Sequence, residues 1–262
     1  MRNRWIKAIS FLICLFLIVP VFVIIPMSFG SSAYLEFPPR GFSLQWYQEF
    51  FGDRKWVASL LYSLRVAIFS TLFSLILGVT AAEGLTRCNF KGKGILQQMY
   101  QLPMIIPVIV TAIALYRFET EIGLRGSTIG LIFAHTLVGL PYVVSTVYSR
   151  RVSVDPNLAN ASQNLGASPV YTMFHITLPM IKPALLSGGL FAFATSFDEL
   201  VISMFLCSTK NSTLPKKIWD GVRSEVDPTI TSIASILIVT ITIIMIISSI
   251  SEYREENPKV NE

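Results

Sequence analysis

Six long apolar segments constrain this chain more than any other feature of its sequence. Each is close to the roughly 20 residues that an α-helix needs to cross a bilayer. Lipid-exposed spans must be helices or closed barrels, and these segments lack the strict alternation of barrel strands. The predicted spans are residues 8–29, 61–85, 98–118, 128–149, 184–207 and 229–251. The sequence therefore predicts an all-α, polytopic membrane protein, a single domain over residues 1–262 with six transmembrane helices and both termini on one side.

The composition agrees with a membrane protein. Hydrophobic residues make up 52% of the chain and charged residues only 14%, against about 25% charged in soluble domains. The net charge of +5 lies in short flanks of the apolar segments, where basic residues report topology, so it does not indicate nucleic acid. Three isolated cysteines (Cys14, Cys88 and Cys207) form neither a disulfide framework nor a metal-binding set.

The first apolar segment is predicted to be a retained helix. It follows Arg2, Arg4 and Lys7, as a secretory signal peptide would, but it exceeds the signal h-region of about 7–15 residues and lacks a small-x-small cleavage site. Lys and Arg divide almost evenly between the two sides, and the basic first flank places the N-terminus in the cytoplasm. Arg150-Arg151, directly at a helix end, agrees with that orientation.

The most strongly punctuated stretch is the loop 155–183, on the predicted cytoplasmic side. Asp155, followed by a proline, is a helix start, and Gly166 is a helix end. Ser168, again followed by a proline, starts a second short helix that breaks near Leu178 and Pro179. Helices this short need a surface to pack against. Leu158, Ala161 and Leu165, at helical spacing, are expected to supply that contact.

The same loop resembles a family motif. Asn160-Ala161-Ser162, three residues, Gly166, nine residues and then Ile176-Thr177-Leu178-Pro179 resemble the "EAA" loop of permease subunits of binding-protein-dependent ABC importers. Asn160 stands where that motif has Glu, and Ser162 where it has Ala. The resemblance implies a type I importer permease, in a bacterial cytoplasmic membrane, whose coupling helix sits in a groove of the ATPase. The residues so assigned to coupling are Leu158, Asn160, Ala161, Ser162, Leu165, Gly166, Ile176, Leu178 and Pro179.

Two other interpretations of this loop are weaker. One is a plain linker between spans, since motif matches alone are hypotheses. The other is a DNA-reading helix-turn-helix, but only His175 and Lys182 within the loop are able to carry positive charge, and phosphate binding needs several cations.

Asp198 and Glu199 are the candidate substrate-pathway residues. Ionisable groups within spans are costly in lipid and usually face the bundle interior or water. The alternative is a structural ion pair with Arg65, Arg117 or a partner subunit. The stretch 196–203, with Thr213-Leu214-Pro215 and 227–230, resembles the second permease of spermidine/putrescine-type importers. Relatives for iron, phosphonate, thiamine or opine share much of this pattern.

Other residues receive more ordinary interpretations. Trp46 and Tyr47 are expected to anchor an interfacial loop and short helix. Glu83 and Arg87 form a surface pair one helical turn apart, without an assigned function. The lone His135 in an apolar span is expected to be packed or hydrogen-bonded rather than a metal ligand.

The sequence contains no phosphate-binding Gly-x-x-x-x-Gly-Lys-Ser/Thr loop, nucleophile elbow or zinc-protease signature. No catalytic or metal-binding residues are therefore assigned, and ATP and Mg²⁺ are expected on a separate subunit. The resemblance implies a second permease, two ATPase subunits and an extracytoplasmic binding protein as partners. The main rival function is an ion-coupled secondary transporter that uses Asp198 and Glu199, although no repeated halves are visible.

Overall fold

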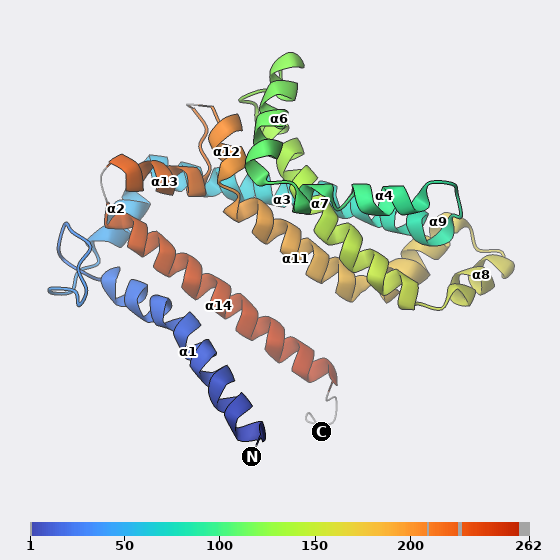
Figure 1. The fold of residues 1–262 in the computed structure, drawn as a ribbon, viewed down its shortest axis with the longest axis horizontal. Coiled ribbons are helices and arrows are strands. Elements are labelled where there is room, and N and C mark those ends of the chain that lie inside the picture. The colour runs from blue at the N-terminus through green and yellow to red at the C-terminus, as the bar shows by residue number, and fades with distance from the viewer. Residues whose placement is uncertain (1, 209, 225–226, 257–262) are drawn as a thin grey trace. The chain divides into compact units, whose positions relative to one another are not determined.

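The computed structural model describes residues 2–208, 210–224 and 227–256, and within them the regular elements are helices (Figure 1). The helices are α1 (Arg2–Met27), α2 (Gln45–Gly52), α3 (Arg54–Arg87), α4 (Lys93–Met99), α5 (Leu102–Ile105), α6 (Val108–Glu121), α7 (Thr128–Ser153), α8 (Pro156–Asn164), α9 (Pro169–Thr172), the π-helical η1 (Met173–Thr177), α10 (Leu178–Met180), α11 (Lys182–Asp198), α12 (Val201–Leu206), α13 (Leu214–Ser224) and α14 (Thr229–Glu256). The chain forms two compact units, one from the two ends of the chain and one from residues 58–217. The predicted all-α class is confirmed.

The terminal unit is built on α1, α2 and α14. α14 packs against both α1 and α2 (Figure 1). The Trp46 indole donates to the Gly30 carbonyl at 2.9 Å, and the Tyr47 hydroxyl bonds to Ser28 Oγ at 2.6 Å and to Ser235 Oγ at 3.2 Å. The predicted short helix is thus confirmed, and the polar atoms of both aromatic residues bind within the protein. The side chains of Arg2 and Arg4 lie outside the described residues.

The central unit is organised around α3, α7 and α11. Val143 of α7 is fully buried and packs closely against Gly78 of α3. A Cβ at Gly78 would lie only 2.6 Å from Val143 Cγ1. A Cβ on Gly188 of α11 would come within 3.2 Å of the Val143 Cα. Small residues let helix backbones approach closely in membrane proteins. Because these two positions are glycines, α3 and α11 can both pack closely against Val143 of α7.

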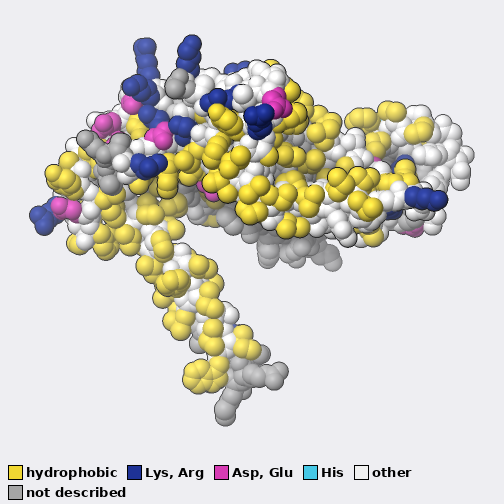
Figure 2. Space-filling model, turned by 45° about the horizontal axis from the view of Figure 1, so that its top comes forward, with side chains coloured by type: hydrophobic (Ala, Val, Ile, Leu, Met, Phe, Trp, Pro, Cys, Tyr) yellow, Lys and Arg dark blue, Asp and Glu magenta, His cyan; other side chains and the backbone are white. Residues whose placement is uncertain are grey.

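In the part of the chain that the structure describes, three helices are long and apolar enough to cross a membrane, over Trp5–Met27, Arg54–Arg87 and Thr128–Ser153. Two bent pairs, at 101° and 75°, raise the number to as many as five, and Thr229–Ile243 is a shorter apolar helix. Figure 2 shows hydrophobic side chains over much of the visible surface, as contact with lipid requires. The chain is thus a multi-pass membrane protein.

Two of the predicted spans are interrupted. Residues 98–118 are divided among α4, α5 and α6. Pro107 favours the extended geometry of Ile106, which ends α5 with a ψ of 133°, and Pro103 lies in the first turn of α5, where its missing N–H is tolerated. Residues 184–207 are divided at Glu199 and Leu200, between α11 and α12. Each is therefore a broken segment where the apolar pattern predicted a continuous one.

Candidate functional site

The first helix of the 155–183 loop begins and ends where its sequence predicts. The Asp155 carboxylate accepts from the Asn157 backbone N–H at 2.9 Å, ahead of α8. Gly166 has a φ of 90°, in the left-handed region that glycine adopts without a Cβ penalty. The Ala167 N–H then donates to the Ser162 carbonyl at 3.2 Å, which satisfies an end carbonyl of the helix. The helix is held at both ends by local hydrogen bonds.

The second helix also starts as predicted, but its interior differs. Ser168 Oγ accepts from the Tyr171 N–H at 3.2 Å, and α9 follows. Residues 173–177 are π-helical, and the Leu178 N–H donates to the Met173 carbonyl five residues back. Pro179 offers no N–H to the His175 carbonyl four residues before it, which favours this wider register. The helix is thus continuous in direction but locally widened.

Ser162 connects the two helices of the loop. Its hydroxyl lies 3.1 Å from Thr172 Oγ1, and Thr172 is fully buried. An alanine at this position, as in the family motif, has no atom to make that bond. The departure at Ser162 therefore adds a polar contact across the turn, whereas Asn160, the other departure, is exposed.

Large apolar side chains of the loop are exposed on both helices. Of the residues predicted to contact a partner, Leu165 is 90% exposed and Leu158 is 46% exposed. The second helix adds Val170, Tyr171 and Phe174, which the sequence reasoning did not select. Large apolar side chains that are exposed on one short element are candidates for contact with a partner. We call these five residues the loop apolar set.

Some of the remaining predicted coupling residues pack against the central unit, and the others are exposed. Leu178 packs against the buried cluster that contains Val143 and Ile181, and Ile176 is partly buried. Ala161 and Pro179 are exposed. The inner end of the loop is therefore seated on the central unit, while its outer residues face away.

Asp198 and Glu199 lie at the break in the fifth apolar segment. Asp198 ends α11 and is exposed, and Glu199 Oε1 accepts from the Ile202 N–H at 2.9 Å, as a cap of α12. Within the described chain, no ion pair joins either carboxylate to Arg65 or Arg117, and Arg117 bonds to Glu121 at 2.7 Å instead. Glu199 thus has a clear local role, and Asp198 keeps its carboxylate available.

His135 is a packed, hydrogen-bonded residue, as predicted. It is fully buried, and its Nδ1 lies 2.9 Å from Ser196 Oγ, which also accepts from Ser70 Oγ at 2.9 Å. In the residues that the structure describes, no group of three or more His, Cys, Asp or Glu side chains lies close enough to hold a metal ion. His135 therefore belongs to a polar contact that joins α3, α7 and α11.

A known protein family matches most of this chain. Residues 74–255 match the family described as the binding-protein-dependent transport system inner membrane component. The chain belongs to this family. The permease is 30% identical over 244 residues to the spermidine/putrescine transport system permease protein PotC of Haemophilus influenzae, covering 93% of this chain and 95% of that protein. It is 32% identical over 270 residues to the putrescine transport system permease protein PotI of Escherichia coli, covering 100% and 95%.

Solved structures agree on the fold of the permease. A chain of a bacterial ABC transporter involved in the import of the acidic polysaccharide alginate superposes with a TM-score of 0.74 at 17% identity. The superposition covers 97% of this chain and 98% of that one. At this identity the likeness concerns the fold alone.

The sequence could have predicted the three exposed residues of the second loop helix that our reasoning did not select. Val170, Tyr171 and Phe174 fall at the spacing of one helical face after the Ser168 cap, the same argument that selected Leu158 and Leu165. Tyr171 and His175 also stack their rings at 4.0 Å. The Arg125 guanidinium lies 4.3 Å from the centre of the Tyr116 ring.

Proposed function

We propose that the permease moves polyamines inward as one of two membrane subunits of an ABC importer. In this proposal it docks two ATPase subunits together with a second permease, and an extracytoplasmic binding protein delivers the substrate. ATP and Mg²⁺ bind to the ATPases, and both termini of the permease lie in the cytoplasm. The observation that carries the proposal is the loop apolar set, presented on two helices that are capped and joined to each other.

The loop has the properties that a docking element needs. Its two helices are too short to persist alone in water, yet their start positions are capped and Ser162 bonds to Thr172 across the turn. A rigid element transmits a displacement instead of absorbing it. ATP-driven closure of the ATPases would move this element, and the pathway would switch access because the docked loop contacts the two states differently.

The polyamine assignment rests on charge and on relatives. The curated relatives are named for spermidine and putrescine transport. Asp198 is an exposed carboxylate at a break in an apolar segment, where broken helices of transporters place their sites. A carboxylate there attracts polyammonium chains and repels anions such as phosphonates. Iron, thiamine and opines remain the competing substrates of this proposal.

Titration of the binding protein that serves this permease tests the substrate. Spermidine, putrescine and ferric ion are added separately, and the heat of binding is measured. We expect saturable binding of one or both polyamines. Binding of ferric ion alone would overturn the substrate assignment and leave the importer assignment intact.

The docking proposal is tested by Leu165→Asp in the assembled complex. A charge at the most exposed apolar position of the loop should reduce the ATPase that co-purifies with the permease by at least about tenfold. Phe42→Asp is the matched control, since Phe42 is also largely exposed, at 82%, but lies outside the loop. Equal ATPase recovery from both variants would contradict docking through this surface.

A secondary transporter is the alternative function, and the break beside Asp198 is the feature that favours it, because such carriers bind ions at discontinuous helices. Proteoliposomes separate the two. Uptake that needs the ATPase and ATP supports the importer. Uptake by the permease alone under an imposed ion gradient supports the carrier.

A further inference from the structure

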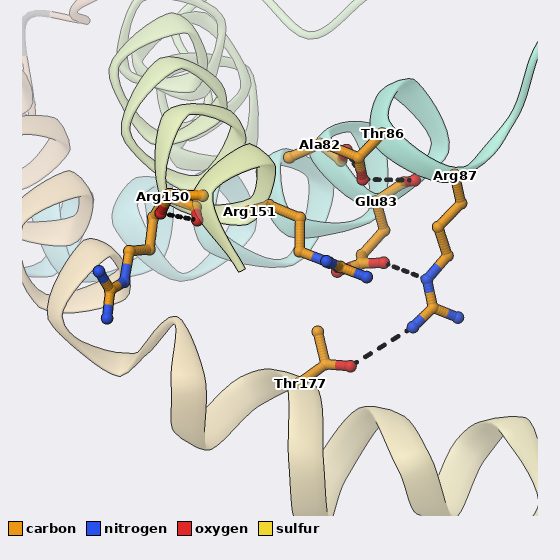
Figure 3. Close-up of polar contacts among 8 residues, drawn as sticks. Ala82, Glu83, Thr86, Arg87, Arg150, Arg151 and Thr177 are labelled. Carbon is orange, nitrogen blue, oxygen red and sulfur yellow. Dashed lines mark hydrogen bonds and ion pairs between the residues drawn. The ribbon is translucent and has the colours of Figure 1, made fainter. Parts of the chain in front are cut away.

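A buried carboxylate joins two helices of the central unit at the end nearest the loop. Glu83 of α3 is 6% exposed and Arg151 of α7 is 5% exposed. Arg151 Nε donates to Glu83 Oε1 at 2.7 Å, so two residues 68 positions apart share a charged hydrogen bond (Figure 3). The predicted pair of Glu83 with Arg87 is confirmed at 2.8 Å, but its placement on the surface is wrong, because α7 covers the carboxylate.

The second oxygen of the carboxylate faces a different kind of partner. Arg87 Nε lies 2.8 Å from Glu83 Oε2, close enough for an ion pair, but its N–H does not point along a hydrogen bond to that oxygen. The Arg87 side chain is 36% exposed, against 5% for Arg151. Glu83 therefore has one buried, aligned partner and one looser, partly hydrated partner.

Arg87 also reaches the loop. Its NH2 group lies 3.5 Å from the hydroxyl of Thr177, which is the last residue of the π-helical segment and is 2% exposed (Figure 3). A neighbouring contact runs in parallel, from Arg150 Nε to the Met180 carbonyl at 3.4 Å. The carboxylate, the two arginines and the hydroxyl thus form a continuous polar connection from α7 through α3 to the loop.

The charges and their burial explain why the Arg151 contact of Glu83 is rigid and the Arg87 contact can change. Two guanidinium groups share one carboxylate, which leaves an excess positive charge. A buried cation that loses its partner is strongly unfavourable, so Arg151 holds Glu83 in place. Arg87 is partly in water, and its long contact with Thr177 costs little to break.

We propose that Glu83 is a positioning residue for coupling, through which movement of the loop reaches α3 and α7 together. Arg151 fixes the ends of α3 and α7 as one body, and Arg87 connects this body to Thr177. Movement of the loop first changes the contact between Arg87 and Thr177. The Glu83–Arg151 pair then transmits the movement to α3 and α7 together. This inference rests on the proposed function, because it assumes that the loop receives its movement from a docked ATPase.

The test measures substrate imported per ATP hydrolysed, in proteoliposomes that contain the complete importer. Glu83→Gln keeps the shape but removes the charge that both arginines share. We expect ATPase recovery with the complex to stay within twofold of wild type and the transport-to-hydrolysis ratio to fall at least about fivefold. A purely structural role would lower the amount of assembled complex without changing that ratio.

Two variants keep the test decisive if Glu83→Gln does not assemble. Thr177→Val preserves shape and removes the hydroxyl, and Arg87→Met removes the charge from a partly exposed site. Each should lower the ratio, and the double variant should lower it no further than Arg87→Met alone, since both act through one contact. Glu121→Gln is the control, because its i,i+4 pair with Arg117 is exposed, at 58% and 79% of the two side chains.

The outcomes separate this inference from the docking proposal. Loss of ATPase from Leu165→Asp, with unchanged transport-to-hydrolysis ratios in Thr177→Val and Arg87→Met, overturns the role of Glu83 and leaves docking standing. Full ATPase recovery with Leu165→Asp refutes docking at this surface instead. Lowered ratios in both variants and an unchanged ratio in Glu121→Gln support the inference.

Discussion

Substitution of Gly78 by alanine tests the packing of the central unit. The new Cβ would lie 2.6 Å from Val143 Cγ1 and 2.9 Å from its Cβ, where ordinary contacts begin at about 3.4 Å. Val143 is fully buried, and a β-branched side chain in a helix has one strongly preferred rotamer. It also lies against Gly188 on the side of α11. Neither the valine nor its helix has room to move, so α3 and α7 must separate.

The magnitude follows from a comparison with Gly84→Ala on the same helix. A Cβ at Gly84 would meet nothing within 4 Å. Both variants gain the same preference of alanine over glycine in a helix, about 1 kcal/mol, so that gain cancels in their difference. What remains is the overpacking at Val143, typically about 1–3 kcal/mol. Gly78→Ala should therefore be less stable than Gly84→Ala by about that amount.

The assay is thermal unfolding of the purified complex in one detergent, followed by loss of the monodisperse species after heating. A difference of this size corresponds to roughly 2–4 °C in midpoint for each kcal/mol. Val143→Ala removes the Cγ1 contact but keeps the Cβ at 2.9 Å, so Gly78→Ala should cost less stability in the Val143→Ala background than in the wild type. Equal midpoints for Gly78→Ala and Gly84→Ala, without this rescue, would refute the three-helix contact.

Three further predictions concern single positions. Gly166→Pro should leave the permease in the membrane but uncouple it, because proline cannot adopt the φ of 90° that ends α8; substrate-stimulated ATPase activity and uptake measure this, and normal values for both would contradict it. Gly130→Ala should lower the membrane yield sharply, since a Cβ at Gly130 would lie 2.7 Å from the Leu124 carbonyl. Glu119→Gln should be tolerated, because the buried Glu119 oxygens have no hydrogen-bond partner among the described residues; membrane yield compares the two variants. Asp198→Asn should raise the KM for polyamine uptake by about tenfold with ATPase recovery unchanged, and an unaltered KM would remove Asp198 from the pathway.

The sequence predicted those parts of the fold that depend on local chemistry. The caps at Asp155 and Ser168 and the turn at Gly166 were predictable, because each rests on the conformational preference of a single residue. The apolar lengths likewise placed α1, α3, α7 and α14 correctly to within several residues.

The parts that sequence reasoning missed depend on contacts between distant residues. The burial of Glu83 requires Arg151, which is 68 positions away, and no local pattern indicates that pairing. The widened turn at residues 173–177 and the break after Asp198 also escaped the apolar pattern, which reports burial in lipid but not helical continuity. The bond from the Ile202 N–H to Glu199 also escaped prediction, since Glu is not among the residues preferred at a helix start.

The interruption at residues 199–200 also affects how the subunit is solvated. The last turn of a helix such as α11 carries four carbonyl groups without donors of their own helix, and hydrocarbon tails supply none. The Ser196 carbonyl of this turn lies 3.1 Å from His135 Nδ1, and water or a neighbouring subunit would cover the others. An orphan permease subunit would thus present a wettable defect to the membrane, and cellular proteases should remove it faster than the assembled pair.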